Sequence, residues 1–441
     1  MEIEITIAIY FTAVLAIGVY SAFKIKSPGD YYIAGKKAGL IPVSGSLLAT
    51  ILGGSAILGT IELSREIGWA ALWFLFSAAV GLAFLIPLSK RVNRFGNYTL
   101  PEMLGLFYGK KAETISSAII PVAWLGIIAA QIIAAAKIIS GLGFIDYNSA
   151  AIVSGIVFII YTLLGGQLSI LKTDALQAVL IITGLTALIF FSLQRIPTAS
   201  FESFSFHALF NSSFTAFDLL VLLLTYSVTF VVGPDIYSRL FCAKNEKTAM
   251  RSILTVALIL IPVSFALTYL GIVSQQTDGT GIISFAEHLL PGWAYGLFIA
   301  ALLSAVMSSA DTTLLTSSMI INELVSGNLK GSNSMKKTRV IIVIMGVLSI
   351  VIALFVTSVI QSLLFALAFF SGAFVIPTLA GLLHIKTNKK RVVAAIIVGG
   401  LIALAGKIIN SYYNETVGNS TIIAAYFINI LILFAPTKKS S

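Results

Sequence analysis

Hydrophobic residues occur along this chain in long blocks that are separated by short polar or charged stretches. A block of about 20 residues has the length that an α-helix needs to cross the hydrocarbon core of a bilayer. Blocks such as residues 340–355 are continuous, whereas the strands of a membrane β-barrel alternate apolar and polar residues. The pattern therefore predicts an all-α membrane protein with about 13 transmembrane helices. We expect these helices at residues 4–23, 38–63, 69–90, 113–141, 148–164, 174–194, 216–237, 250–274, 291–325, 338–357, 360–384, 392–409 and 420–436.

The composition supports this class and leaves no room for a large soluble domain. Of the 441 residues, 58% are hydrophobic and 10% are charged, whereas a soluble protein carries about a quarter charged residues. The mean hydropathy is +1.00. We expect residues 1–441 to form a single transmembrane domain. The outer stretch at 275–290 is expected to form a turn and a short surface helix, as a lid or a plain connector.

The first hydrophobic block and the only cysteine bear on how the chain is processed. Glu2 and Glu4 stand where a signal peptide has basic residues, and no small-residue cleavage site follows. We therefore expect the first block to be a retained helix. Cys242 has no second cysteine for an internal disulfide, so a disulfide-stapled secreted domain is not expected.

Lysine and arginine residues lie almost entirely in alternate loops. The net charge is +10, and only Arg65 and Arg195 fall in the loops of the opposite side. This asymmetry predicts that the N-terminus lies outside the cell and the C-terminus inside. The positive charge thus indicates orientation and contact with anionic lipid, and we expect no nucleic-acid partner. We expect a multi-pass protein of the cell membrane that functions as a monomer. The basic loops lie at 24–37, 90–111, 172, 239–251, 330–339, 386–391 and 438–439.

Two predicted helices contain residues that break helices. Gly53 and Gly54 interrupt the helix at 38–63. Each glycine lowers helix stability by about 1 kcal/mol relative to alanine, so a break here would free backbone carbonyls. In lipid such carbonyls need protein, water or an ion as a partner. Close helix packing through small residues is the alternative. The segment Gly233-Pro234-Asp235 lies toward the inner end of the helix at 216–237. Proline kinks a helix, and we interpret this segment as a helix end at the membrane interface.

A polar stripe lies on the predicted helix at 291–325. Ala305, Ser308, Ser309 and Thr312 share one face because they are three or four residues apart, and Asp311 lies one turn from Ser308. Such hydroxyl and carboxylate oxygens suit an alkali cation. The alternative is that the hydroxyls bond to carbonyls of their own helix, but the density of oxygen-bearing side chains favours a cation site. An intramembrane aspartate should also face the interior and have a partner.

A second buried acid is expected at Asp174, at the inner start of the helix at 174–194. Aspartate is a common helix N-cap, and a cap can also face a cavity. The two interpretations are therefore compatible.

These segments together resemble the sodium:solute symporter family, which includes the sodium/proline, sodium/galactose and sialic-acid transporters. The matching segments occur in the family's order over about residues 30 to 385. They are Tyr32-Ile33-Ala34-Gly35-Lys36-Lys37 with Ala49–Ser55, Tyr161–Gly166 with Thr173-Asp174 and Gln177, Gly233-Pro234-Asp235-Ile236-Tyr237-Ser238-Arg239, and Ala305–Thr312.

The resemblance implies a LeuT-type fold with two inverted five-helix repeats, at 38–194 and 216–384. A leading helix and loop at 4–37 precede them, and two helices at 392–436 follow. It also implies a sodium site between the broken first core helix and the eighth, which agrees with freed carbonyls at a helix break. Carried over by position, the Na⁺ ligands are the carbonyls of Ala49, Leu52 and Ala305 and the hydroxyls of Ser308 and Ser309.

Some family members bind a second sodium ion nearer the cytoplasm, and the positions that match this site depart from the family pattern. They are Asp174, Ser308, Asp311 and Thr312, and Asp311 replaces a hydroxyl residue of the family. Two carboxylates in one small site repel each other, so that either a cation bridges them or one holds a proton. The hypothesis is a second cation or proton site at Asp174, Asp311 and Thr312.

The resemblance also places a solute beside the sodium site. The candidate solute-binding residues are Gly53, Gly54, Ser55, Trp124, Gln131, Tyr226 and Phe230. Gln131 is equally suited to bond neighbouring helices. Tyr226 and Phe230 could line the pocket or be core residues, and the core is the commoner place for such side chains. Ile51 stands where the sodium/proline branch has an aspartate, and no arginine lies near Gly126, where sialic-acid transporters have one. Proline-like amino acids, monocarboxylates and pantothenate-like acids therefore all stay open.

The implied function is secondary active transport, in which inward sodium flow drives uptake of a small organic solute by alternating access. A proton-coupled carrier or a facilitative channel on the same fold, and a solute sensor, are the alternatives. An enzyme is not expected, because His207, His288 and His384 are scattered in or near loops and no His-Glu-x-x-His motif occurs.

Overall fold

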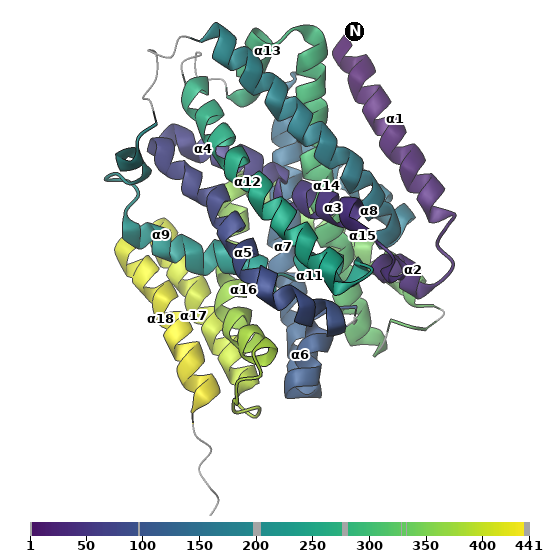
Figure 1. Cartoon of the computed structure of the whole chain (residues 1–441), viewed down its shortest axis with the longest axis vertical. Coiled ribbons are helices and arrows are strands. Elements are labelled where there is room, and N and C mark those ends of the chain that lie inside the picture. Colours follow the sequence, from purple (N-terminus) through teal and green to yellow (C-terminus); the bar gives the residue numbers. More distant parts are fainter. Residues whose placement is uncertain are drawn as a thin grey trace, which may run out of the picture.

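The protein is described here by a computed structural model, which covers residues 2–95, 98–196, 204–275, 281–327, 329–331 and 333–435. Within these ranges the chain is helical, and its β-structure consists of the isolated bridges Ala38–Ala243 and Asn211–Phe214. Ten helical segments of the described chain are long and apolar enough to cross a membrane, judged by length and composition. In Figure 1, α13 and the start of α1 lie at the upper end of the molecule and α6 lies at the lower end.

The elements follow one another with few long connections. In chain order they are α1 (Glu2–Ala22), α2 (Pro28–Ile33), η1 (Ala34–Lys36), α3 (Leu40–Ile51), α4 (Gly54–Ile67), η2 (Gly68–Ala71), α5 (Leu72–Phe95), α6 (Leu100–Tyr108), α7 (Lys110–Gly141), α8 (Tyr147–Arg195), η4 (Phe206–Leu209), α9 (Ala216–Leu222), η5 (Leu223–Ser227), α10 (Val228–Val232), α11 (Pro234–Cys242), α12 (Glu246–Ser274), α13 (Ile282–Leu289), α14 (Gly292–Ser326), α15 (Ser334–Phe355), α16 (Val359–Leu382), α17 (Val392–Tyr412) and α18 (Glu415–Phe434).

The predicted helix at 38–63 is broken where the glycines occur. α3 ends at Ile51, and α4 begins at Gly54 after Gly53, whose backbone is extended (φ −59°, ψ 166°). The Leu52 amide still bonds to the Leu48 carbonyl at 2.8 Å. The last carbonyls of a helix have no amide partner within it, so the break leaves the following α3 carbonyls available inside the protein.

A second break lies at Gly233, and here the interpretation as a helix end at the interface is wrong. Gly233 is extended (φ −65°, ψ 130°), and Pro234 starts α11, which continues to Cys242. Proline is tolerated in the first turn because its missing amide would have no partner there. Almost all of α11 is buried, so the break lies within the protein interior.

The predicted helices at 148–164 and 174–194 follow each other directly within α8. They meet at a kink at Gly166 (φ 52°, ψ −171°), where a Cβ atom would lie 2.6 Å from the ring of Tyr31. Because the helix resumes at once after Gly166, Asp174 lies about two turns inside it. The interpretation of Asp174 as an N-cap is therefore wrong.

The helix that carries the polar stripe lies at the centre of the molecule. α14 has 35 residues, and nearly all of them between Ala294 and Glu323 are buried. It packs against α1, α3, α7, α8 and α15. Its polar side chains therefore face protein on all sides and are kept away from lipid.

Some expectations concern residues at the margin of the described chain. The short surface helix expected after the outer turn is present as α13, whereas residues 276–280 of that turn lie outside the described ranges. Lys438 and Lys439 also lie outside them. The lone cysteine, Cys242, is fully buried at the end of α11.

Candidate ion and solute site

The end of α3 lies against the polar stripe of α14. The Ser309 hydroxyl donates to the Thr50 carbonyl at 2.6 Å, and the Ser308 and Thr50 hydroxyls lie 3.5 Å apart. By contrast, Ser304 and Thr313 bond to carbonyls of their own helix at 2.7 Å. Ser309 thus bonds to the broken helix, and the Ser308 hydroxyl lies beside it.

The backbone groups expected to bind sodium lie on these same two segments. Ala49 and Leu52 belong to the end of α3 and Ala305 to the facing part of α14, and all three are fully buried. The Ser309 hydroxyl donates its hydrogen to Thr50, which leaves its lone pairs free to accept. The segment therefore offers carbonyl and hydroxyl oxygens of modest charge in a buried place.

Both glycines at the break are needed for close approach. A Cβ atom on Gly53 would lie 2.2 Å from the Ser309 hydroxyl oxygen. A Cβ atom on Gly54 would lie 2.2 Å from a methyl carbon of Val306 and 3.0 Å from Ala134. The alternatives of packing and ion binding therefore do not exclude each other, because the tight packing occurs at the candidate ion site.

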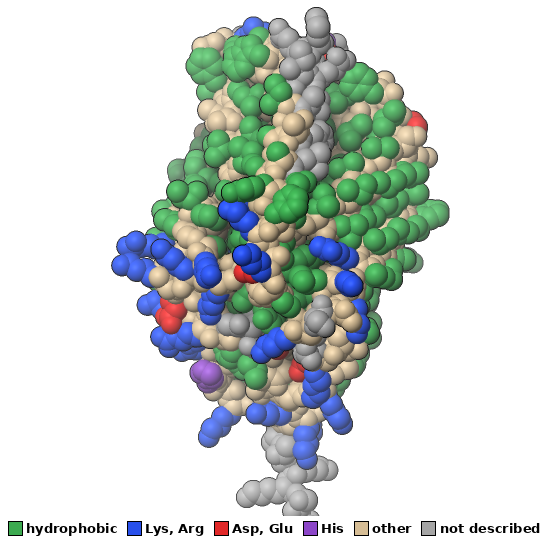
Figure 2. All heavy atoms as spheres, turned by 90° about the vertical axis from the view of Figure 1, so that its right-hand side faces the viewer, with side chains coloured by type: hydrophobic (Ala, Val, Ile, Leu, Met, Phe, Trp, Pro, Cys, Tyr) green, Lys and Arg blue, Asp and Glu red, His purple; other side chains and the backbone are tan. Residues whose placement is uncertain are grey.

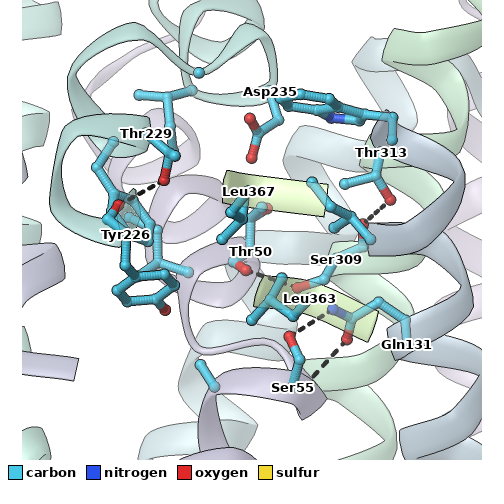
Figure 3. Close-up of a pocket in the computed structure, with 17 residues that line it drawn as sticks. Thr50, Ser55, Gln131, Tyr226, Thr229, Asp235, Ser309, Thr313, Leu363 and Leu367 are labelled. Atoms are coloured by element: carbon cyan, nitrogen blue, oxygen red, sulfur yellow. Dashed lines mark hydrogen bonds between the residues drawn. The ribbon is translucent and has the colours of Figure 1, made fainter. Parts of the chain in front are cut away.

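A cavity of about 60 Å³ adjoins this break (Figure 3). This volume has room for several water molecules, because a single water molecule needs about 10–15 Å³ of such space. Of the predicted solute-binding residues, Ser55, Trp124, Gln131, Tyr226 and Phe230 line this cavity, whereas Gly53 and Gly54 are not among its lining residues. Ser309, predicted as a sodium ligand, also lines the cavity. The further lining residues were not predicted as part of the site, and they are Thr50, Ile51, Ala56, Ile127, Thr229, Gly233, Asp235, Ile236, Thr313, Leu363 and Leu367.

The Gln131 side chain joins α7 to the start of α4. Its amide nitrogen donates to the Ser55 hydroxyl at 2.8 Å, and its oxygen accepts from the Ser55 backbone amide at 3.4 Å. Figure 3 shows this pair at the edge of the cavity. Gln131 therefore bonds two helices and lines the cavity at the same time.

Aromatic rings form another part of the lining. Tyr226 stacks on Phe74 with ring centres 4.5 Å apart, and its ring meets that of Phe230 edge-on at 5.0 Å. Trp124 packs edge-on against Phe370 at 4.7 Å. Its indole N–H is buried and has no hydrogen-bond acceptor among the described residues, so that it can serve a molecule in the cavity.

A single charged side chain, Asp235, occurs among the described lining residues. The residue follows the Gly233-Pro234 break and lies in the first turn of α11. Figure 3 shows its carboxylate directed toward the inside of the ring of lining residues. The Gly-Pro-Asp sequence was a usable signal, because a helix break beside an acid in mid-chain can mark a binding cavity as well as a helix end.

The second group of predicted residues surrounds an arginine. The Asp174 carboxylate accepts from the Ser46 hydroxyl at 2.5 Å and lies 3.4 Å from the Arg239 guanidinium. That guanidinium also donates to the Thr50 hydroxyl at 2.7 Å and to the Thr312 hydroxyl. Arg239 was expected in a basic inner loop, and this expectation is wrong because its side chain is fully buried.

Asp311 completes this buried cluster. It accepts a bond from the neighbouring Thr312 hydroxyl at 3.3 Å and lies close enough to Asp174 for the two charges to repel. One oxygen of each carboxylate has no hydrogen-bond partner among the described residues. Asp174, Asp311 and Thr312 are thus brought together, with one guanidinium for two carboxylates.

A broken helix facing a hydroxyl-lined helix, beside a central cavity in an all-helical membrane protein, is typical of secondary transporters. The sequence profile of the sodium:solute symporter family matches residues 31–399, and the chain belongs to this family. Sodium is accordingly the coupling ion. The expectation of a transporter, not an enzyme, is confirmed.

Relatives of known activity cover most of the chain. The sodium/proline symporter of Haemophilus influenzae is 26% identical over 91% of this chain and 88% of its own length. The sodium/pantothenate symporter of Escherichia coli is 25% identical over 94% of this chain and 92% of its own length. The chain therefore matches these symporters nearly from end to end.

Solved structures support the fold class. A Na⁺-coupled sialic acid symporter in a substrate-bound outward-open state superposes with a TM-score of 0.75 at 20% identity, over 100% of this chain and 99% of that one. A nucleobase-cation-symport-1 family transporter in a closed conformation, with bromovinylhydantoin bound, superposes with a TM-score of 0.60 at 13% identity. The match covers 91% of this chain and 93% of that one. The likeness is one of fold, and it confirms the all-helical LeuT-type class.

Proposed function

We propose that the protein couples inward sodium flow to uptake of a small organic solute by alternating access. The carbonyls of Ala49, Leu52 and Ala305 and the hydroxyls of Ser308 and Ser309 bind the sodium ion. The observation that carries this assignment is the direction of the Ser309 hydroxyl, which bonds to the broken helix and not to its own. Unwound carbonyls and hydroxyls replace the water shell of an alkali cation.

The solute occupies the adjoining cavity. Ser55, Trp124, Gln131, Tyr226 and Phe230 contact it, while Gly53 and Gly54 let α4 approach α14 and α7 closely enough to form the wall. Proline and pantothenate, the solutes named for the relatives, are the first candidates, together with monocarboxylates.

Sodium-dependent stabilisation tests this function directly. In a thermal-shift screen against small metabolites, a solute is expected to raise the melting temperature in Na⁺ and not in K⁺, because binding to the folded state alone stabilises it. The same solute should accumulate in proteoliposomes only when an inward sodium gradient is present. Uptake that follows a proton gradient or needs no gradient would favour the carrier or channel, and binding without uptake would favour a sensor.

The Ser309→Ala variant serves as the matched test of the ion site, since it removes one proposed ligand without adding bulk. The variant is expected to need a higher sodium concentration for half-maximal uptake. Thr183→Ala is the control, because Thr183 is an exposed hydroxyl residue that bonds only to its own helix. Equal sodium dependence in both variants would contradict the assignment of Ser309.

We further propose about 13 spans with the N-terminus outside and the C-terminus inside. The inverted repeats comprise residues 38–194 and 216–384, between the leading segment 4–37 and the two final helices at 392–436. Figure 2 supports the orientation, since lysine and arginine side chains gather on the lower part of the face shown. Basic residues favour the cytoplasmic side of the cell membrane, where they meet anionic lipid. We expect a monomer to be sufficient.

The hypothesis of a second cation or proton site at Asp174, Asp311 and Thr312 stays a prediction. The carboxylate oxygens without partners support it, because one guanidinium balances one carboxylate and leaves the other uncompensated. Asp311→Asn is expected to change the number of positive charges carried per solute, or the pH dependence of uptake. Reversal-potential and pH measurements on Asp174→Asn and Asp311→Asn check this; no change in either variant would contradict it.

A further inference from the structure

The charge inside the solute cavity points to the chemical class of the solute. We propose that the Asp235 carboxylate binds an ammonium group, so that the solute carries a protonated or quaternary amine. The inference rests on the proposed function only in taking this cavity as the solute site. It favours amino acids and amines over monocarboxylates and pantothenate-like acids.

The backbone break brings the carboxylate to the cavity. Gly233 ends α10, and Pro234 restarts the chain as α11, so that Asp235 faces inward at the level of the cavity. A Cβ atom on Gly233 would lie 2.9 Å from an Asp235 carboxylate oxygen and 2.5 Å from the Thr229 carbonyl. Glycine at this position therefore lets the chain turn closely around the acid.

No basic residue of the described chain forms an ion pair with the Asp235 carboxylate. Arg239, one turn further along α11, attracts the Asp235 carboxylate through space, but it bonds to the Asp235 backbone carbonyl at 3.2 Å and its remaining donors bond to Ser46, Thr50, Asp174, Ser238 and Thr312. An intramembrane acid is costly without a partner. A cationic solute group would supply that partner in the cavity.

The other lining groups fit the same solute. Tyr226, Phe230 and Trp124 provide aromatic rings, whose faces attract cations. Trp124 is only 1% exposed, and its indole N–H has no acceptor among the described residues. This N–H group can therefore donate to an oxygen elsewhere on the solute. The described lining contains no lysine, arginine or histidine. A purely anionic solute would therefore have no basic side chain to bind in the cavity.

Matched pairs of compounds that differ in the ammonium group test this inference. Choline is compared with 3,3-dimethyl-1-butanol, and L-proline with cyclopentanecarboxylate, by thermal shift of the full-length protein in Na⁺ and in K⁺. The ammonium member of at least one pair is expected to bind, and its counterpart, which has carbon in place of the charged nitrogen, is expected to bind at least about tenfold more weakly because it cannot pair with the carboxylate. Asp235→Asn should remove this preference, and Asp235→Glu should keep part of it.

The outcomes separate this inference from the sodium-coupling proposal. Ammonium binding that is indifferent to sodium would support the inference and contradict the coupling. Sodium-dependent binding of cyclopentanecarboxylate or pantothenate, with no ammonium compound bound, would overturn the inference and leave the coupling standing. Unchanged ammonium affinity in Asp235→Asn would overturn it as well. If that variant fails to fold, the comparison of the two compounds of each pair on the unchanged protein decides whether the solute must carry an ammonium group.

Discussion

Replacing Arg239 by alanine is expected to lower the free energy of unfolding by about 3–5 kcal/mol, the usual cost of removing one partner of a buried ion pair. The Arg239 guanidinium and the Asp174 carboxylate are both fully buried and lie 3.4 Å apart. Without the guanidinium, the acids Asp174 and Asp311 would face each other without a cation. Reversible unfolding in mixed detergent micelles, followed by tryptophan fluorescence, measures the loss.

Two variants give this prediction its controls. Arg94 pairs with Glu246 at 2.5 Å, but the two side chains are 71% and 31% exposed, and Arg94→Ala should cost only about 0–1 kcal/mol. Combining Arg239→Ala with Asp174→Asn removes both charges and should regain part of the stability. A loss for Arg239→Ala as small as that for Arg94→Ala would show that the cluster does not depend on the guanidinium.

Replacing Gly53 by alanine is expected to weaken sodium binding by about 10- to 100-fold, the range seen when groups that support metal ligands are altered. The added Cβ atom would lie 2.2 Å from the Ser309 hydroxyl oxygen and 3.3 Å from the side-chain oxygen of Gln131. It must therefore displace a proposed sodium ligand and disturb the wall of the cavity. Sodium titrations of solute uptake in proteoliposomes measure the change.

Gly39→Ala is the matched control, because a Cβ atom at Gly39 meets nothing within 4 Å and Gly39 is the N-cap residue of α3, as Gly53 is of α4. It should keep the original sodium dependence. Equal sodium affinity in Gly53→Ala and Gly39→Ala, with both proteins folded, would contradict the placement of the ion at the α3 break.

Local sequence chemistry predicted the helices and the first break. Long apolar blocks determine where helices can span a bilayer, and paired glycines in mid-block predict a break that the structure has at Leu52 and Gly53. The polar stripe on α14 was likewise visible, because helical periodicity puts its hydroxyls on one face. These features depend on residues close together in sequence.

The parts that could not be predicted depend on contacts between distant segments. Arg239 was assigned to a basic loop because arginine near a helix end usually faces water or lipid headgroups, and its burial depends on partners from α3, α8 and α14. Asp235 was assigned to a helix end because the neighbouring Pro234 breaks the helix. Its place in the cavity depends on distant segments, since α3, α4, α7, α14 and α16 all contribute to the wall.

The bonds of Arg239 also affect how much conformational freedom the ligand side chains lose when sodium binds. Arg239 holds the Thr50 hydroxyl, and the Thr50 carbonyl in turn holds the Ser309 hydroxyl. Side chains that are already fixed lose little rotational freedom when a ligand arrives, and such preorganisation strengthens binding. The guanidinium therefore helps to hold the Ser309 hydroxyl of the proposed ion site in place without a bound ion.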